Sequence, residues 1–221
     1  MKRLSAAAQC IGLSGRFGVF ADFFGHRTRA AKWLGVAAQM RLLQGPHIAL
    51  NLIRTDTFDI GLQQEIDFGL KTMRRIYATV NIGVGRVQRY VVPPGHEVIA
   101  GHDEADDLWD AYSVPNDGID VFLVRAIPGG VNGISPTDGT CDKDSKDDSG
   151  CVIDMQDGSD GVGFTLGQLI AHEVGHYLGL PHENGLPDNL MFPTVPNGGT
   201  LYGGQGGAMV LHCAVAPGCN L

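Results

Sequence analysis

Three histidines recur within the stretch AHEVGHYLGLPHENG, residues 171–185. His172 and His176 are four positions apart, so on a helix both imidazoles leave the same face about one turn apart. Gly179 can end such a helix in the left-handed conformation, and His182 can then return as a third nitrogen donor. Three neutral imidazoles with an open fourth position are typical of a catalytic zinc site, whereas structural zinc sites usually have four protein ligands.

Glu173 follows the first of these histidines, and on a helix it points to the flank of the face that carries them. From there its carboxylate can contact a metal-bound water without binding the ion. Zinc lowers the pKa of its bound water towards about 7 and polarises a carbonyl oxygen, and Glu173 can take the proton as general base. The alternative is a helix whose histidines are satisfied within the protein, or the inactive remnant of an enzyme.

A helix that carries the histidines should begin just before Leu166. Thr165 is placed as an N-cap, and Gln168 three residues later would complete a capping box. Phe164 and Leu169 have the spacing of a hydrophobic staple. The sequence therefore predicts a helix that starts near residue 166 and runs through both histidine positions.

The pattern H-E-x-x-H-x-x-G-x-x-H followed by a Met-turn is typical of the metzincin zinc metalloproteases. Residues 172–182 fill every specified position, and PDNLMFP, residues 187–193, resembles the Met-turn. The chain thus resembles this family over about residues 165–193, without indicating a subfamily. The resemblance implies a zinc-dependent metalloendopeptidase that hydrolyses peptide bonds of a polypeptide substrate, with one catalytic zinc. Its site residues would be the metal ligands His172, His176 and His182, the general base Glu173, and the supporting residues Gly179 and Met191.

The resemblance also implies a fold. It is a metzincin-like α/β fold with a mixed, mostly parallel twisted sheet, an antiparallel edge strand, an active-site helix and an irregular C-terminal subdomain that ends in a helix. The edge strand, at residues 131–135 or close by, would bind an extended substrate by strand addition. Some family enzymes have a tyrosine two residues after the Met-turn methionine, where this chain has Pro193. Tyr202 is a candidate to reach the site instead, with packing as its other role.

Hydrophobic periodicity upstream agrees with an α/β layer, because strands and helices alternate as in parallel crossovers. Over residues 60–78, apolar residues recur at steps of three and four, which predicts a helix with one buried stripe. The other expected helices cover residues 104–112 and 204–215. The expected strands cover residues 47–56, 80–92, 118–127, 131–135 and 151–155.

The 221-residue chain is long enough for one domain with its own hydrophobic core. We expect a basic N-terminal segment, residues 1–45, and a metalloprotease domain, residues 46–221, divided into an upper subdomain (46–179) and a lower one (180–221). The first segment carries seven basic residues and one acidic residue, and the remaining 176 residues carry 9 basic and 23 acidic ones. The segment could be an extension, a pro-segment or a secretion signal.

The acidic body disfavours nucleic acid as a partner, because phosphate backbones would be repelled. No apolar run has the eighteen or so residues that a membrane helix needs. The expected partner is therefore a polypeptide substrate, with no membrane span and an unassigned oligomeric state.

Five cysteines leave at least one without a partner if the others form disulfides. Sequence proximity favours Cys141–Cys151 and Cys213–Cys219, each closing a small loop. Such bridges indicate an oxidising, extracytoplasmic compartment, so secretion is expected. Cys10 is left over, as a free thiol or as a thiolate that blocks the metal from a pro-segment.

Calcium is a second candidate metal, because residues 141–151 concentrate aspartates in one loop. The spacing departs from that of an EF-hand, so a solvated loop is the favoured interpretation. A second aspartate group, at positions 154, 157 and 160, has no better support. The histidines outside the motif have no partner at ligand spacing: His26, His47, His96, His102 and His212.

Two other functions compete with peptide hydrolysis. One is a catalytically inactive, zinc-containing binding module, which would not require a general base at Glu173. The other is a hydrolase of a non-peptide amide, which would use the same groups.

Overall fold

The computed structural model describes residues 45–143, 148–156, 158–196 and 198–218. The expectations for residues 1–44 and for Cys10 and Cys219 lie outside these ranges. The strands are β1 (His47–Arg54), β2 (Gly83–Val91), β3 (Ile119–Val124), β4 (Gly133–Ile134) and β5 (Gly150–Asp154). The helices are α4 (Ile60–Ala78), α5 (His102–Tyr112), α6 (Phe164–Tyr177) and α7 (Gly203–Val210).

One five-stranded sheet organises the domain, with the strand order β2-β1-β3-β5-β4. β1, β2, β3 and β5 are parallel, and β4 pairs antiparallel with β5 at the edge. All six residues of β3 are buried, as expected for a central strand covered on both faces. The fold is therefore the mixed, mostly parallel α/β sheet with an antiparallel edge strand that the sequence predicted.

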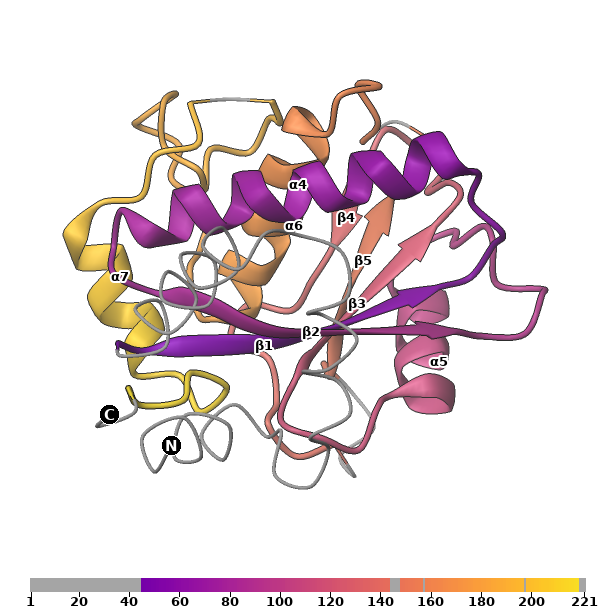
Figure 1. Cartoon of the computed structure of the whole chain (residues 1–221), viewed down its shortest axis with the longest axis horizontal. Coiled ribbons are helices and arrows are strands. Elements are labelled where there is room, and N and C mark those ends of the chain that lie inside the picture. Colours follow the sequence, from indigo (N-terminus) through magenta and orange to yellow (C-terminus); the bar gives the residue numbers. More distant parts are fainter. Residues whose placement is uncertain (1–44, 144–147, 157, 197, 219–221) are drawn as a thin grey trace, which may run out of the picture.

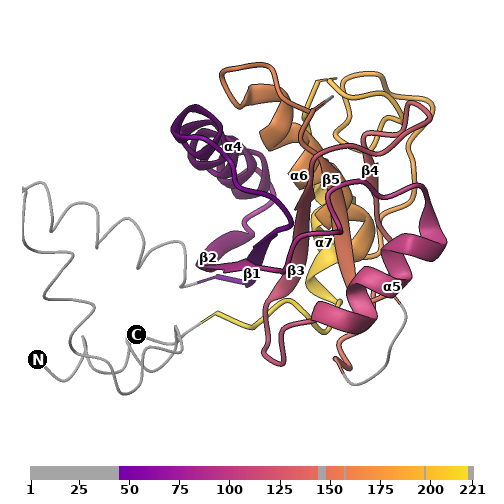
Figure 2. The same cartoon turned by 90° about the vertical axis from the view of Figure 1, so that its right-hand side faces the viewer.

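Helices cover both faces of this sheet (Figures 1 and 2). α4 and α6 lie together on one face, and their apolar residues join those of β1, β3 and β5 in the larger core cluster. α5 covers the opposite face, where Leu108 and Trp109 pack against Phe122 and Val152. None of the described helices is long and apolar enough to span a membrane.

α4 has the bounds that its hydrophobic period predicts. Ile66, Leu70, Met73 and Tyr77 form its buried stripe. The side chain of Asp59 accepts a hydrogen bond from the Leu62 N–H at 2.8 Å and so caps the first turn. Local capping and amphipathicity agree here, which explains why this element was predictable residue by residue.

The start of α6 differs from the expected capping box. Gly163 is the N-cap, with φ 88°, and it has no side-chain capping bond. The Asp160 carboxylate instead accepts from the backbone N–H groups of Gly163 and Thr165, at 2.5 and 2.7 Å. Phe164 is 52% exposed, so the predicted staple is wrong as well. A carboxylate at a helix N-terminus satisfies more donors than a threonine hydroxyl and complements the helix dipole.

The disulfide pairing predicted from sequence proximity, Cys141–Cys151 and Cys213–Cys219, is also wrong. Cys141 is bonded to Cys213, 72 residues away, with a Cα–Cα distance of 6.2 Å. Cys151 is a buried free thiol within β5. The tertiary fold brings the loop after β4 against the segment after α7, so the bridge ties two distant parts of the chain.

Candidate metal centre

Three imidazoles converge at the end of α6, as the motif spacing predicts. The Nε2 atom of His172 lies 3.1 Å from Nε2 of His176 and 3.3 Å from Nε2 of His182. The donor atoms of the three residues all lie within 4.8 Å of one another. His172 and His176 are buried on the helix, whereas His182 is exposed in the segment that follows it.

Hydrogen bonds fix the orientation of the two helical imidazoles. Nδ1 of His172 is 2.7 Å from the Leu190 carbonyl oxygen, and Nδ1 of His176 is 2.6 Å from that of Leu180. A carbonyl oxygen only accepts, so each Nδ1 carries the proton and each Nε2 presents a lone pair towards the other histidines. Carbonyl partners of this kind are typical of metal-binding histidines.

The spacing of these lone pairs fits a zinc ion. Tetrahedral coordination with Zn–N bonds of about 2.0–2.1 Å places two nitrogen ligands about 3.3 Å apart. The Nε2–Nε2 distances of 3.1 and 3.3 Å agree with that value. Because two lone pairs facing each other at this distance repel, a shared cation explains the arrangement better than hydrogen bonding between the rings does.

Burial also keeps the helical imidazoles neutral, the form that binds metals. Desolvation, together with the nearby histidines, lowers the pKa of His176 to about 4. Desolvation likewise lowers the pKa of His172, and the neighbouring His182 contributes in the same direction. At neutral pH both rings therefore offer a lone pair without first losing a proton.

Glu173 is buried beside the histidines, between α6 and the edge strand β4. Its side chain is in direct contact with Gly133: a Cβ placed on that glycine would lie 2.5 Å from Glu173 Oε1. Burial raises the pKa of the Glu173 carboxyl to about 8. A cation at the three histidines would favour the carboxylate again, so this group can both take and return a proton near neutral pH.

Gly179 turns the chain between the second and third histidines. Its φ is 89°, in the left-handed region that glycine adopts without a Cβ penalty. The Gly179 N–H donates to the His176 carbonyl oxygen at 2.8 Å, and the Leu180 N–H donates to that of Gly175 at 3.0 Å. This αL turn ends α6 and redirects the chain to His182.

Met191 lies buried against α6 on the side of the histidines. A Cβ on Gly175 would be 2.7 Å from the Met191 Sδ atom, so the thioether packs directly on the helix backbone. The Asn189 side chain accepts from the Met191 N–H at 2.8 Å and donates to Gln205 at 2.8 Å. Sequence reasoning missed Asn189 and Gln205, although Asn189 lies inside the predicted Met-turn.

The family comparison matches the part of the chain that builds this centre. The profile of the metallopeptidase family M12B, reprolysin-like, matches residues 95–183, which include all three histidines. The chain also has the fold of the archaemetzincin from Methanopyrus kandleri, with a TM-score of 0.54 and 14% identity over 74% of this chain and 93% of that one. The chain has a metzincin-like fold.

Other comparisons are more distant. The metalloproteinase-II from Bacteroides fragilis is similar with a TM-score of 0.48 and 13% identity over 75% of this chain. The metzincin-like chain spans about half of that protein, 53% of its length. No curated protein matches the chain.

Tyr202, the candidate for the place of the missing tyrosine, makes its hydrogen bond away from the histidines. Its hydroxyl donates to Asp188 Oδ2 at 3.2 Å, and the residue is 40% exposed. Pro193 is exposed and carries no group that could assist catalysis. Among the described hydrogen bonds, none joins Tyr202 to a nitrogen of the three histidines.

The calcium candidates gain no support among the described residues. In the aspartate-rich loop, positions 144 and 147 lie outside the described ranges. In the second group, Asp157 lies outside them too, Asp154 accepts from the Ile127 and Gln156 N–H groups, and Asp160 caps α6. These carboxylates are occupied by backbone donors and therefore stabilise loops.

Proposed function

We propose that this metzincin-like chain is a zinc-dependent endopeptidase whose catalytic centre consists of His172, His176, His182 and Glu173. The observation that carries the proposal is the convergence of three Nε2 atoms at the spacing of a tetrahedral site, with a carboxyl group on the adjacent helix position. The three histidines leave one coordination position for water or substrate, which is the arrangement of a catalytic rather than a structural site.

Each residue of the centre has a separate role. His172 and His176 hold the metal from α6, and the backbone carbonyls of Leu190 and Leu180 keep their rings in the binding orientation. Zinc, when bound, supplies a Lewis acid for the scissile carbonyl and acidifies water. Glu173 takes the proton from the attacking water and passes it to the leaving amine, so no covalent intermediate is needed.

The substrate would lie along β4. This strand is the free edge of the sheet, pairs with β5 on its other side, and contacts Glu173 through Gly133. An extended peptide that adds to this edge would pass directly over the metal centre, with its backbone carbonyls available to the ion. This geometry favours a polypeptide over a small amide, because strand addition requires a peptide backbone on both sides of the scissile bond.

The disulfide Cys141–Cys213 favours an oxidising compartment outside the cytoplasm. We therefore propose that the enzyme acts after export. Detection of the bridge in protein purified from its natural source, by mass spectrometry without prior reduction, would test this placement.

The test of the catalytic assignment is Glu173→Gln, which keeps the side-chain volume and removes the base. We expect this variant to bind one zinc per chain and to lose about 10²–10⁴-fold in kcat for peptide cleavage. Glu183→Gln is the matched control, because Glu183 follows His182 directly and its Oε1 accepts only from the Gly185 N–H among the bonds described. It should retain activity within a few fold.

A peptide library read by mass spectrometry separates the competing functions. Internal cuts by the zinc-loaded chain, absent in the presence of a zinc chelator, support the endopeptidase. Zinc binding without any cut would favour a binding module, and turnover of small amides alone would favour an amidohydrolase. Full activity of zinc-loaded Glu173→Gln would overturn the assigned mechanism.

A further inference from the structure

The loop of residues 138–141, called the latch loop below, ties the last turn of α6 to the C-terminal segment. Two of its backbone N–H groups donate to the carbonyl oxygens of His176 and Tyr177, at 3.0 and 2.8 Å. At its end, Cys141 is disulfide-bonded to Cys213. The bridge therefore connects the segment after α7 to the helix end that carries one of the metal-centre histidines.

His212 lies beside this bridge, and together with the two cysteines it gives three potential metal ligands. Cys141, His212 and Cys213, called the Cys-His cluster below, each offer one donor atom, and these atoms lie within 4.8 Å of one another. Among the described residues, this cluster and the three histidines of the metal centre are the two groups with that property. Both cysteines are exposed, whereas His212 is 8% exposed.

The ring of His212 is already oriented as metal-binding imidazoles are. Its Nε2 is 2.9 Å from the Gly139 carbonyl oxygen, which only accepts, so the ring proton is on Nε2. The lone pair on Nδ1 accepts the Ala214 N–H at 3.1 Å, so a metal ion at this nitrogen would displace that backbone donor. A carbonyl that holds one ring N–H while the other nitrogen offers its lone pair is the usual outer support of a histidine ligand.

We propose that reduction of the Cys141–Cys213 disulfide converts the Cys-His cluster into a second metal site. A dithiol reductant transfers two electrons and two protons to the bridge, leaving two cysteine thiols and an oxidised, disulfide-form reductant. Binding of one divalent cation then releases both thiol protons, so that two thiolates and His212 Nδ1 hold the ion. The oxidised bridge and the metal are mutually exclusive occupants of the same place.

The donor set selects the metal class. Two thiolates and one imidazole suit a soft or borderline divalent cation such as Zn²⁺ or Cd²⁺ rather than Ca²⁺ or Mg²⁺. Asp138 Oδ1 lies 3.6 Å from His212 Nε2, which is the protonated side of the ring. This distance is too long for a hydrogen bond, so the Gly139 carbonyl remains the acceptor of the ring N–H. Water would take the fourth position.

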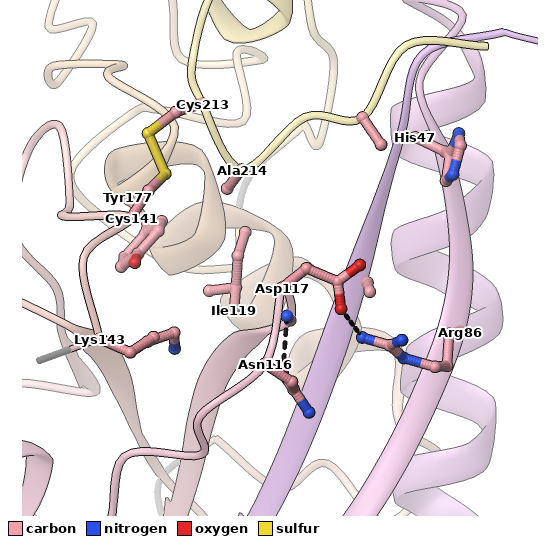
Figure 3. Close-up of a pocket in the computed structure, with 13 residues that line it drawn as sticks. His47, Arg86, Asn116, Asp117, Ile119, Cys141, Lys143, Tyr177, Cys213 and Ala214 are labelled. Carbon is pink, nitrogen blue, oxygen red and sulfur yellow. Dashed lines mark hydrogen bonds and ion pairs between the residues drawn. A yellow bond between two sulfur atoms is a disulfide. The ribbon is translucent and has the colours of Figure 1, made fainter. Parts of the chain in front are cut away.

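Reductant and metal can both reach the sulfur atoms. Cys141 and Cys213 line a cavity of about 220 Å³, together with Lys143 and Tyr177 (Figure 3). Figure 3 shows the disulfide on the wall of this cavity beside the Tyr177 ring. In reducing surroundings the bound ion would replace the broken bridge as the cross-link, and the latch loop would stay attached to the C-terminal segment.

The experiment uses the full chain with Cys10→Ser, Cys151→Ala and Cys219→Ser, so that only the two bridge cysteines remain. The protein is reduced with a phosphine, desalted without oxygen and titrated with Cd²⁺ or Co²⁺. We expect a thiolate-to-metal charge-transfer band that accounts for one bound ion per chain, with release of two protons, while the three histidines take a second ion. The oxidised protein should show no such band. The three histidines of the metal centre contain no sulfur and cannot produce it.

His212→Gln, in the same background, tests the third ligand and should weaken the thiolate-bound metal by more than about tenfold. Its matched control is His96→Gln, which removes a histidine that bonds Tyr112 elsewhere in the fold. If the reduced protein unfolds, added Cd²⁺ should restore its far-ultraviolet circular dichroism along with the band. Absence of the band in reduced protein, or equal affinity in His212→Gln, would overturn the proposal.

Discussion

Gly133 and Glu173 are in van der Waals contact across the space between the edge strand β4 and the helix α6. A Cβ on Gly133 would lie 2.5 Å from Glu173 Oε1 and 2.6 Å from its Cγ, closer than any real Cβ contact allows. The edge strand thus limits the positions that the Glu173 carboxylate can take. Position 133 requires glycine because a Cβ there would clash with the Glu173 side chain. No sequence motif specifies this glycine.

Gly133→Ala should therefore displace the Glu173 carboxylate while the three histidines still bind zinc. A misplacement of about 1 Å at a catalytic group can cost about 10²-fold, so we expect a loss of at least about tenfold in kcat. The measurement is steady-state peptide cleavage together with zinc content. Gly101→Ala is the control, because a Cβ there meets nothing within 4 Å. Wild-type kcat in Gly133→Ala would show that the contact does not position the base.

Asn189→Ala should loosen the turn that carries Met191. Asn189 is fully buried, and its amide bonds both the Met191 N–H and the Gln205 side chain. Loss of one buried hydrogen-bonding partner costs about 1–3 kcal/mol, so the free energy of unfolding should fall by that amount. Chemical denaturation of the zinc-loaded protein measures it. The exposed Asn184→Ala should change stability by less than about 0.5 kcal/mol.

Asp160→Ala should destabilise the protein in a pH-dependent way. Although desolvation raises the pKa of Asp160, the backbone N–H groups of Thr165, Val162 and Gly163 hold it well below its usual value. The stabilisation is therefore present above the unfolded-state pKa of about 3.9 and disappears as the pH falls through the lower folded-state pKa. At neutral pH a lost helix cap costs about 0.5–2 kcal/mol.

Unfolding of both proteins at pH 7 and at successively lower pH checks this expectation. The gap between wild type and Asp160→Ala should be constant at neutral pH and narrow in acid. Asp107→Asn, an exposed substitution on α5, controls for the change in net charge. A gap that widened in acid would contradict the assigned cap.

Tyr202→Phe should have little effect on catalysis. The Tyr202 hydroxyl donates to Asp188 at the protein surface and is not bonded to the histidines. We expect kcat/KM to change by less than about threefold, which corresponds to less than about 0.7 kcal/mol of transition-state stabilisation. A drop of 10²-fold with normal zinc content would mean that Tyr202 moves to the substrate and assists the reaction.

Local sequence patterns predicted an element correctly where one short stretch of chain contains the interactions that define it. The stripe of Ile66, Leu70, Met73 and Tyr77, with Asp59 at the start, defined α4 because period and cap lie within twenty residues. The i, i+4 histidines and Gly179 predicted the cluster of three histidines for the same reason: helix geometry and one αL turn bring these side chains together.

Predictions that depended on choosing between nearby candidates were less reliable. Thr165 and Gln168 have the spacing of a capping box. In the structure, however, the Asp160 carboxylate from the preceding loop caps the helix instead. The predicted strand over residues 131–135 has only Gly133 and Ile134 in the ladder, because pairing with β5 ends there. Strand length is decided by the partner strand, which sequence does not identify.

The sequence by itself determined the three histidines that lie together, the helix that spaces two of them and the alternation of elements that builds a mostly parallel sheet. Only the tertiary structure decided that Cys141 meets Cys213, that Gly133 limits Glu173, and that Asn189 and Gln205 hold the Met191 turn. The physical reason is the distance along the sequence between the residues that interact. Helix periodicity and turn chemistry act over a few residues, whereas these contacts join segments 16 to 72 residues apart and exist only after the chain has packed.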